Sequence, residues 1–253
     1  MTQYVKFDRP PVVEVACGVR FDAGGRLKGA HLGAFWATIK GAYPVAEEAP
    51  PIVRRPEIDP QAIAPRTWLI TTDGSELIQL QKDWFLLNWK KSTDGQSYPS
   101  YGTVKNRFDE QFTRFQTFLS GEQIQLSYKE FELTYVNHIS KSNGLPELGE
   151  GGLLVDHAFA AKDRFLPSPT AINWRTAYPL PKGYGQLTVA AQTGSVKATS
   201  EQVVRVDLQA TGLPGESPED NMNDWFDVAH EWITRGFVDA TTPELHAIWG
   251  RTL

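Results

Sequence analysis

The sequence predicts an α+β protein with a largely antiparallel sheet of about six to eight strands and helices packed on one face. Segments in which apolar and polar residues alternate recur along the chain, and tight turns such as Asp73-Gly74 separate them. Only a few segments with helical periodicity interrupt these strands. The 253 residues, 41% of them hydrophobic, are enough to fill one large core, so we expect a single domain over residues 1–253.

The first half of the chain is expected to contain strands, one early helix and one irregular segment. Four strands are predicted from alternation and turn residues, at 12–21, 68–72, 76–81 and 84–90. Apolar residues at helical spacing predict an amphipathic helix over residues 32–39. The six prolines between Pro44 and Pro65 indicate an extended surface excursion without regular structure.

The clearest helix of the sequence is expected over residues 104–119. Its apolar side chains recur on one stripe, namely Val104, Phe108, Phe112, Phe115 and Leu119. Gly121 is placed to cap its end. We expect the stripe to share one core with Val13, Val15 and Leu133.

The second half is expected to add strands followed by two terminal helices. Four strands are predicted, at 131–139, 171–178, 186–192 and 203–210. A turn at Thr193-Gly194-Ser195 separates the last two strands. Ser217-Pro218 opens one helix, and Thr242-Pro243 opens a shorter one, because a hydroxyl cap followed by proline is typical of a helix start.

Composition excludes several classes of protein. Cys17 is the only cysteine, so we expect no disulfide, and five scattered histidines predict no metal site and no cofactor. No apolar run is long enough for a signal peptide or a membrane span, which predicts a cytoplasmic protein without membrane contact. The net charge of −5 and the lack of Lys/Arg blocks argue against nucleic-acid binding. Nothing in the sequence indicates an oligomeric state.

No catalytic motif is recognisable. The sequence has no P-loop and no Gly-x-Ser-x-Gly elbow, and Gly183-Tyr184-Gly185 lacks the third glycine of a dinucleotide fingerprint. The pattern His-Glu-x-x-His of metalloproteases fails at His230-Glu231, since Thr234 takes the place of the second histidine. The chain is therefore assigned no reaction.

Polar residues on the outward face of the strands are the most site-like set. Alternation places Glu14, Glu132, His138 and Arg205 on that face. If they converge, the carboxylates and His138 suit general acid–base work, and Arg205 suits an anionic substrate. Cross-strand ion pairing is the alternative that we favour.

Aromatic residues offer a second alternative. Four of them, Trp84, Trp89, Tyr98 and Tyr101, are close in sequence to Lys90, Lys91 and Lys105, and single-stranded nucleic-acid binders combine such residues in stacking platforms. Core packing is favoured because the basic run is short.

Acidic residues are concentrated at the carboxyl end. Residues 216–253 carry eight acidic and two basic side chains. Four of the acidic residues, Asp220, Asp224, Asp227 and Glu231, recur at i, i+4, i+7 and i+11 and so form one helical stripe. The stripe is either a solvated helix face or a binding surface for a basic partner.

Several short segments resemble a family of sporadically distributed bacterial proteins of about 250 residues and uncharacterised function. The similar segments, in order, are Pro10-Pro11-Val12-Val13-Glu14-Val15, Leu77-Ile78-Gln79-Leu80-Gln81, Asn88-Trp89, Tyr98-Pro99, Glu132-Leu133-Thr134-Tyr135-Val136-Asn137, Thr242-Pro243-Glu244-Leu245-His246 and Trp249-Gly250. The resemblance implies a single compact unit in a bacterium and a gene of the accessory kind, including mobile-element or defence cargo. It supplies no catalytic residues.

Taken together, these features favour a non-enzymatic protein-interaction or accessory subunit that acts with the product of a neighbouring gene. The alternative is a small-molecule hydrolase or transferase with an acidic, His and Arg groove over the sheet.

Overall fold

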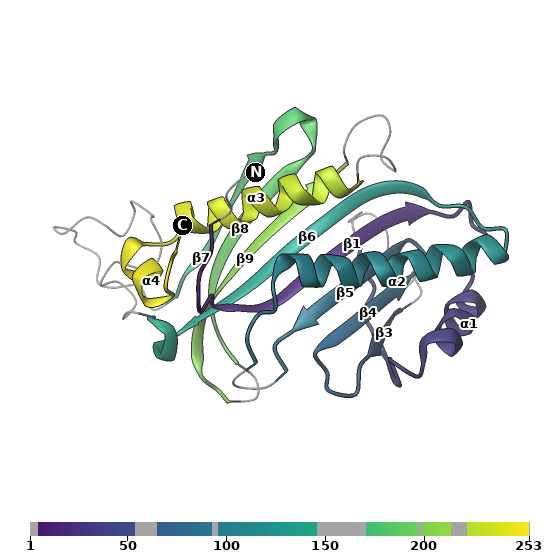
Figure 1. The fold of residues 1–253 in the computed structure, drawn as a ribbon, viewed down its shortest axis with the longest axis horizontal. Helices are drawn as coiled ribbons and strands as arrows, with labels where there is room; N and C mark the ends of the chain where they lie inside the picture. The colour runs from purple at the N-terminus through teal and green to yellow at the C-terminus, as the bar shows by residue number, and fades with distance from the viewer. Residues whose placement is uncertain are drawn as a thin grey trace. The chain divides into compact units, whose positions relative to one another are not determined.

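The computed structural model describes residues 5–53, 65–92, 96–145, 171–196, 199–213 and 222–252. In this part of the chain, nine strands form one open antiparallel sheet in the order β2-β3-β4-β5-β1-β6-β9-β8-β7, shown in Figure 1. The strands are β1 Val12–Asp22, β2 Val45–Ala49, β3 Arg66–Ile70, β4 Glu76–Gln81, β5 Trp84–Lys90, β6 Ser127–Ser140, β7 Asn173–Pro179, β8 Gln186–Ser195 and β9 Gln202–Gly212. The helices are α1 Gly29–Ile39, α2 Tyr101–Gly121, α3 Met222–Ala240 and α4 Pro243–Ile248. The α+β class and the antiparallel sheet are confirmed.

The sheet has nine strands rather than six to eight because β2 lies inside the predicted excursion. Its residues pair with β3 in antiparallel register, from Val45 opposite Ile70 to Ala49 opposite Arg66. The first four of its five side chains are exposed. Backbone pairing at the edge of the sheet therefore forms this strand without a buried face.

The contacts divide the chain into two compact units. The α2 unit contains Glu14–Glu132 and Glu216–Met222, and the α3 unit contains Met1–Val13, Leu133–Gly215 and Asn223–Leu253. Two of the boundaries fall inside the strands β1 and β6. The single domain expected from the sequence stays a prediction.

Helix α2 packs on the sheet of its own unit through phenylalanine rings. Phe85 of β5 has its ring centroid 5.3 Å from that of Phe112 and 5.3 Å from that of Phe115. Phe108 stacks on Phe112 at 5.5 Å. All four rings are buried, as are Val104 and Val15, which confirms the predicted stripe. Val13 and Leu133, expected in the same core, belong to the α3 unit.

Gly121 does not cap α2. The helix includes Gly121, and the left-handed residue is Gln123, with φ of 56°. The N–H of Ile124 donates to the carbonyl of Leu119, and that of Gln123 donates to Ser120, which is a Schellman ending. Leu119 and Ile124 are both buried, so an apolar contact decides where the helix ends.

Helix α3 packs on β8 and β9 of its own unit. A Cβ at Gly236 would lie 3.0 Å from Leu187 Cδ2 and 3.7 Å from Leu208 Cδ2, so the glycine allows a close approach. The buried face of α3 contains Trp225, Phe226, Ala229, Ile233 and Phe237. The indole of Trp225 donates to the carbonyl of Tyr184 at 2.9 Å and fixes the start of the helix.

Two further turn and cap predictions had different outcomes. The predicted turn at Thr193-Gly194-Ser195 is wrong, because these residues continue β8 and pair with Val204, Val203 and Gln202. Helix α4 begins at Pro243 after Thr242 as expected. The Ser217-Pro218 start lies outside the described residues.

Candidate functional site

The four predicted catalytic residues fall into two pairs that belong to different units. Glu14 and Glu132 lie in the α2 unit, and His138 and Arg205 lie in the α3 unit. Each pair has its own polar neighbours.

In the α2 unit, a chain of side-chain hydrogen bonds crosses four strands and ends at Glu14. The indole of Trp68 donates to Gln79 at 3.1 Å, Gln79 donates to Asn88 at 2.6 Å, and Asn88 donates to the Glu14 carboxylate. Gln79 and Asn88 are buried. Because each amide donates towards Glu14, the chain stabilises the negative charge of that carboxylate.

Glu132 is buried, with 7% of its surface exposed, although the sequence places it on the outward face. Arg66 supplies the nearby positive charge. Burial lowers the pKa of Arg66, while the negative charges of Glu132 and Glu14 oppose that shift. The charges of the two carboxylates therefore both act on one half-buried guanidinium.

In the α3 unit, Arg205 forms an ion pair with Asp207 on the same strand. Its Nε donates to both carboxylate oxygens at 2.8 Å. Burial and the charge of Arg205 lower the pKa of the half-buried His138, and Asp207 and Glu201 act in the opposite direction. His138 is therefore neutral at pH 7 and next to a guanidinium that is already paired. This ion pair lies within one strand, β9, whereas the alternative expected from the sequence was pairing across strands.

The acidic stripe lies on α3. Asp224 and Asp227 are exposed, and Glu231, whose side chain is 29% exposed, forms an ion pair with Arg235 at 3.0 Å. Asp220 lies outside the described residues. From Met222 to Ala240 the helix carries four acidic residues and one arginine, a net charge of −3 (−4 + 1) with His230 neutral.

A cleft runs between α3 and the strands β7 and β8. We call it the α3 cleft; its volume is about 380 Å³, which lies within the range of ligand-binding clefts. It is lined by Trp174, Tyr178, Leu187, Val189, Glu231, Trp232, Arg235, Gly236, Asp239 and Ala240. All of these residues belong to the α3 unit.

Strand register and helix spacing build the cleft. Trp174 and Tyr178 lie on one face of β7, opposite Ala191 and Leu187 of β8. On the helix, Trp232, Gly236 and Ala240 follow one another at i+4 spacing and face the same side. Gly236 lets α3 approach Leu187 closely, which brings Trp232 and the aromatic residues of β7 to the same cleft.

Sequence reasoning found only Glu231 among the cleft residues. The signal that it missed is an aromatic pair at alternate strand positions, Trp174 and Tyr178, of which Tyr178 remains 45% exposed. Trp232 of α3 is half-buried.

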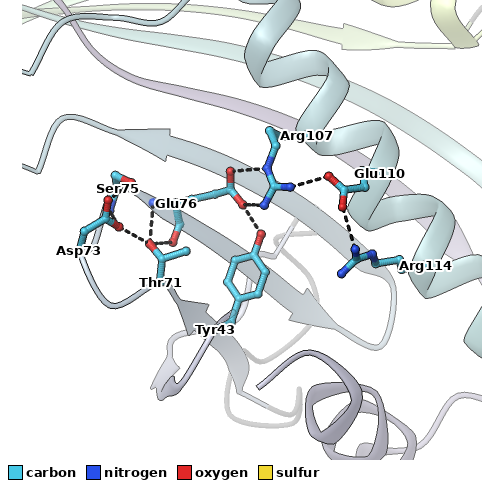
Figure 2. A network of polar contacts seen from close by, with 8 residues as sticks. All are labelled: Tyr43, Thr71, Asp73, Ser75, Glu76, Arg107, Glu110 and Arg114. Atoms are coloured by element: carbon cyan, nitrogen blue, oxygen red, sulfur yellow. Dashed lines mark hydrogen bonds and ion pairs between the residues drawn. The ribbon is translucent and has the colours of Figure 1, made fainter. Parts of the chain in front are cut away.

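A second polar network, in the α2 unit, joins α2 to the start of β4 (Figure 2). The guanidinium of Arg107 donates to both oxygens of Glu76, at 3.1 and 2.9 Å, and also to Glu110. Tyr43 donates its hydroxyl to Glu76. Burial and this hydrogen bond raise the pKa of Tyr43, and the hydrogen bond with Glu76 raises the pKa of Arg107.

This network fixes elements rather than forming a reactive group. Tyr43 follows α1, Glu76 opens β4, and Arg107 lies on α2, so one carboxylate connects three elements. At the turn before Glu76, hydrogen bonds from Thr71 and Ser75 lower the pKa of Asp73. Tyr43 and Arg107 keep their protons at neutral pH, which suits a structural role.

Two of the four aromatic residues suggested as a stacking platform are part of the core, and the other two, Tyr98 and Tyr101, are half-buried. Trp84 and Trp89 are buried, with 0% and 7% of their surfaces exposed. Five residues apart on one strand, they point to opposite faces of the sheet. Lys105 is buried as well, and its ammonium is bound to Asp109 at 2.7 Å.

His230 and His246 are also packed inside the α3 unit. The ring of His230 lies against Tyr135, and burial lowers its pKa to about 4. His246 Nε2 shares a hydrogen bond of 2.8 Å with Thr241. In the described part of the chain, no group of three or more His, Cys, Asp or Glu is placed to hold a metal ion.

Two observations bear on the relation to other proteins and to membranes. No protein-family model matches this chain, and no curated protein matches it. The resemblance to a sporadically distributed bacterial family therefore stays a prediction. No helix among the described residues is long and apolar enough to span a membrane.

Proposed function

We propose that this protein is a non-enzymatic interaction subunit that binds a protein partner through the α3 unit. The observation that carries this proposal is the α3 cleft, with two aromatic side chains on the edge strand β7 and a third, Trp232, on α3. Tyrosine and tryptophan are enriched at protein interfaces, where they supply large contact areas at low entropic cost.

Edge strand β7 adds backbone groups to this surface. It stands last in the strand order, and among the described residues it pairs with β8 alone. Figure 1 shows β7 at the margin of the sheet in its unit. The outer side of such a strand presents N–H and C=O groups that accept an added strand.

The charge of α3 favours a basic partner. Its net charge of −3 includes the exposed residues Asp224 and Asp227, which lie on the same helical stripe as Glu231 of the cleft. Complementary charge speeds association and selects among partners more than it adds affinity. A partner with a basic binding segment is therefore expected.

The test begins with purification of the tagged protein from its native host and identification of a specific partner. Association rates are then measured over a salt series for wild type and the double variant Asp224→Asn, Asp227→Asn. The variant should associate more slowly at low salt, by about threefold or more. The difference should shrink as salt screens the attraction over about 8–10 Å.

A matched control removes the same charge from the other unit. Glu47 and Glu48 are exposed on β2, and the double variant Glu47→Gln, Glu48→Gln should associate at the wild-type rate. The proposal is wrong if no specific partner is recovered, or if the α3 variant and the control have the same rate at low salt.

A further inference from the structure

The proposed function leaves open what the α3 cleft recognises. Building on that function, we propose that the cleft binds an arginine side chain from a partner segment that adds to the outer edge of β7 as an extra strand. Three properties of the cleft lead to this occupant: its aromatic walls, one carboxylate without a partner among the described residues, and the side-chain directions along the edge strand.

The walls suit a planar cation. Trp174, Tyr178 and Trp232 line the cleft, and a guanidinium stacks on aromatic faces through cation–π attraction. Gly236 also lines the cleft, where it lets α3 lie close to Leu187. A long, flat side chain that stacks on aromatic faces fits these walls better than a branched aliphatic one.

The charges of the lining select a cation over a neutral group. Glu231 is already bound to Arg235 at 3.0 Å. The carboxylate of Asp239 is exposed and has no hydrogen bond or ion pair with the residues that the structure describes. Since the cleft lining has two carboxylates and one guanidinium, its net charge is −1 (−2 + 1), and Asp239 is left to bind the incoming cation.

The edge strand gives the partner its register. Trp174 and Tyr178 are four residues apart, so both point to the cleft side of the sheet. A strand added to β7 continues the same sheet, with its backbone about 4.7–4.9 Å from that of β7. Every second side chain of the added strand lies on the cleft side of the sheet. One arginine among those alternate positions enters the cleft, and the side chains between the alternate positions face the other side.

Two peptides test the proposal without an identified partner. The first is acetyl-Val-Thr-Val-Arg-Val-Thr-Val-amide, and the second has citrulline, an uncharged isostere, in place of arginine. The full-length protein is labelled with ¹⁵N at tryptophan, and the indole signals of Trp174 and Trp232 are assigned with Trp174→Phe and Trp232→Phe. The arginine peptide should move both signals and should bind about tenfold more tightly than the citrulline peptide.

Single charge variants complete the test. Asp239→Asn, at an exposed position, should lower the affinity for the arginine peptide by about tenfold and leave the affinity for the citrulline peptide unchanged. Glu244→Gln removes one exposed charge from α4 of the same unit, and it should change neither. Equal affinities of the two peptides, or indole signals that do not move, would overturn the arginine site.

The partner found for the proposed function separates the two claims. If Asp239→Asn binds that partner with wild-type affinity while the Asp224 and Asp227 variant binds it more slowly, the arginine site is wrong and the interaction function stands. If Asp239→Asn lowers the affinity for the partner as much as it lowers the affinity for the arginine peptide, the arginine site is supported.

Discussion

Truncation of Phe112 to alanine tests the packing of the α2 unit. Phe112 has 1% of its surface exposed, and its ring lies 5.3 Å from Phe85 and 5.5 Å from Phe108. Loss of a buried phenylalanine ring costs about 3–5 kcal/mol, because transfer free energy is lost and a cavity remains. The neighbouring rings are buried themselves and have little room to move into the space, so we expect the upper part of that range.

Urea unfolding followed by tryptophan fluorescence measures this free energy. Four of the eight tryptophans, Trp36, Trp68, Trp84 and Trp89, belong to the α2 unit and report on its unfolding. The midpoint should fall while the urea dependence of the free energy stays constant, since the surface exposed on unfolding is nearly the same.

A second phenylalanine on the same helix is the matched control. Phe118 is half-buried, with its ring 5.7 Å from that of Phe35. Phe118→Ala should cost about 1–2 kcal/mol, because part of its ring is already in water. If Phe112→Ala costs no more than Phe118→Ala, the assignment of the buried face of α2 is wrong.

Two further substitutions test His230 and Glu76. The pKa of His230 is lowered to about 4 by burial, so between about pH 6.5 and 4 the unfolded chain binds a proton that the folded chain does not. The free energy of unfolding of wild type should therefore fall by about 3 kcal/mol as the pH drops through this window. His230→Gln should lack that part of the fall, as measured by urea unfolding at several pH values; equal slopes would contradict the buried, neutral imidazole. Glu76→Gln removes the charge that binds Arg107 and Tyr43, and it should lower the free energy of unfolding by about 1.5–3 kcal/mol. The control Arg114→Gln breaks only the exposed pair with Glu110, and it should cost about 0.3–0.5 kcal/mol; similar losses in the two variants would show that the Glu76 network contributes little.

Periodicity predicts the elements whose own side chains are buried. The stripe of α2 is apolar at helical spacing, and β4 and β5 flank turns with strong residue preferences, so local sequence is sufficient for them. Strand β2 has no such pattern, because Val45–Ala49 is mostly exposed and held by its pairing with β3. Only knowledge of the neighbouring strand reveals it.

The end of α2 shows how tertiary contacts decide a cap. Glycine at position 121 satisfies the usual preference for a helix end, yet Gln123 takes the left-handed conformation. The burial of Leu119 and Ile124 on either side of that residue fixes the ending two positions later. The free energy gained by burying the side chains of Leu119 and Ile124 outweighs the strain of one left-handed glutamine, which is about 1 kcal/mol.

The α3 cleft could not be derived from the sequence because it depends on how helix α3 packs against the strands β7 and β8. Its walls come from β7, β8 and α3, and the distance between α3 and β8 depends on the close approach of Gly236 to Leu187. Alternation shows that Trp174 and Tyr178 share a face, but it does not show that a helix with a small residue passes over them.

The predicted catalytic set illustrates a limit of face parity. Parity assigns Glu132 and His138 to one face of β6, and six residues along a strand correspond to about 20 Å. Side chains that act on one small substrate must lie within a few ångströms of each other, and positions i and i+2 of a strand meet that condition. Arg205 and Asp207 do so, with contacts of 2.8 Å. The rise per residue, applied together with parity, therefore separates Glu132 from His138. Each of the two has a different charged neighbour in its own unit: Arg66 for Glu132 and Arg205 for His138.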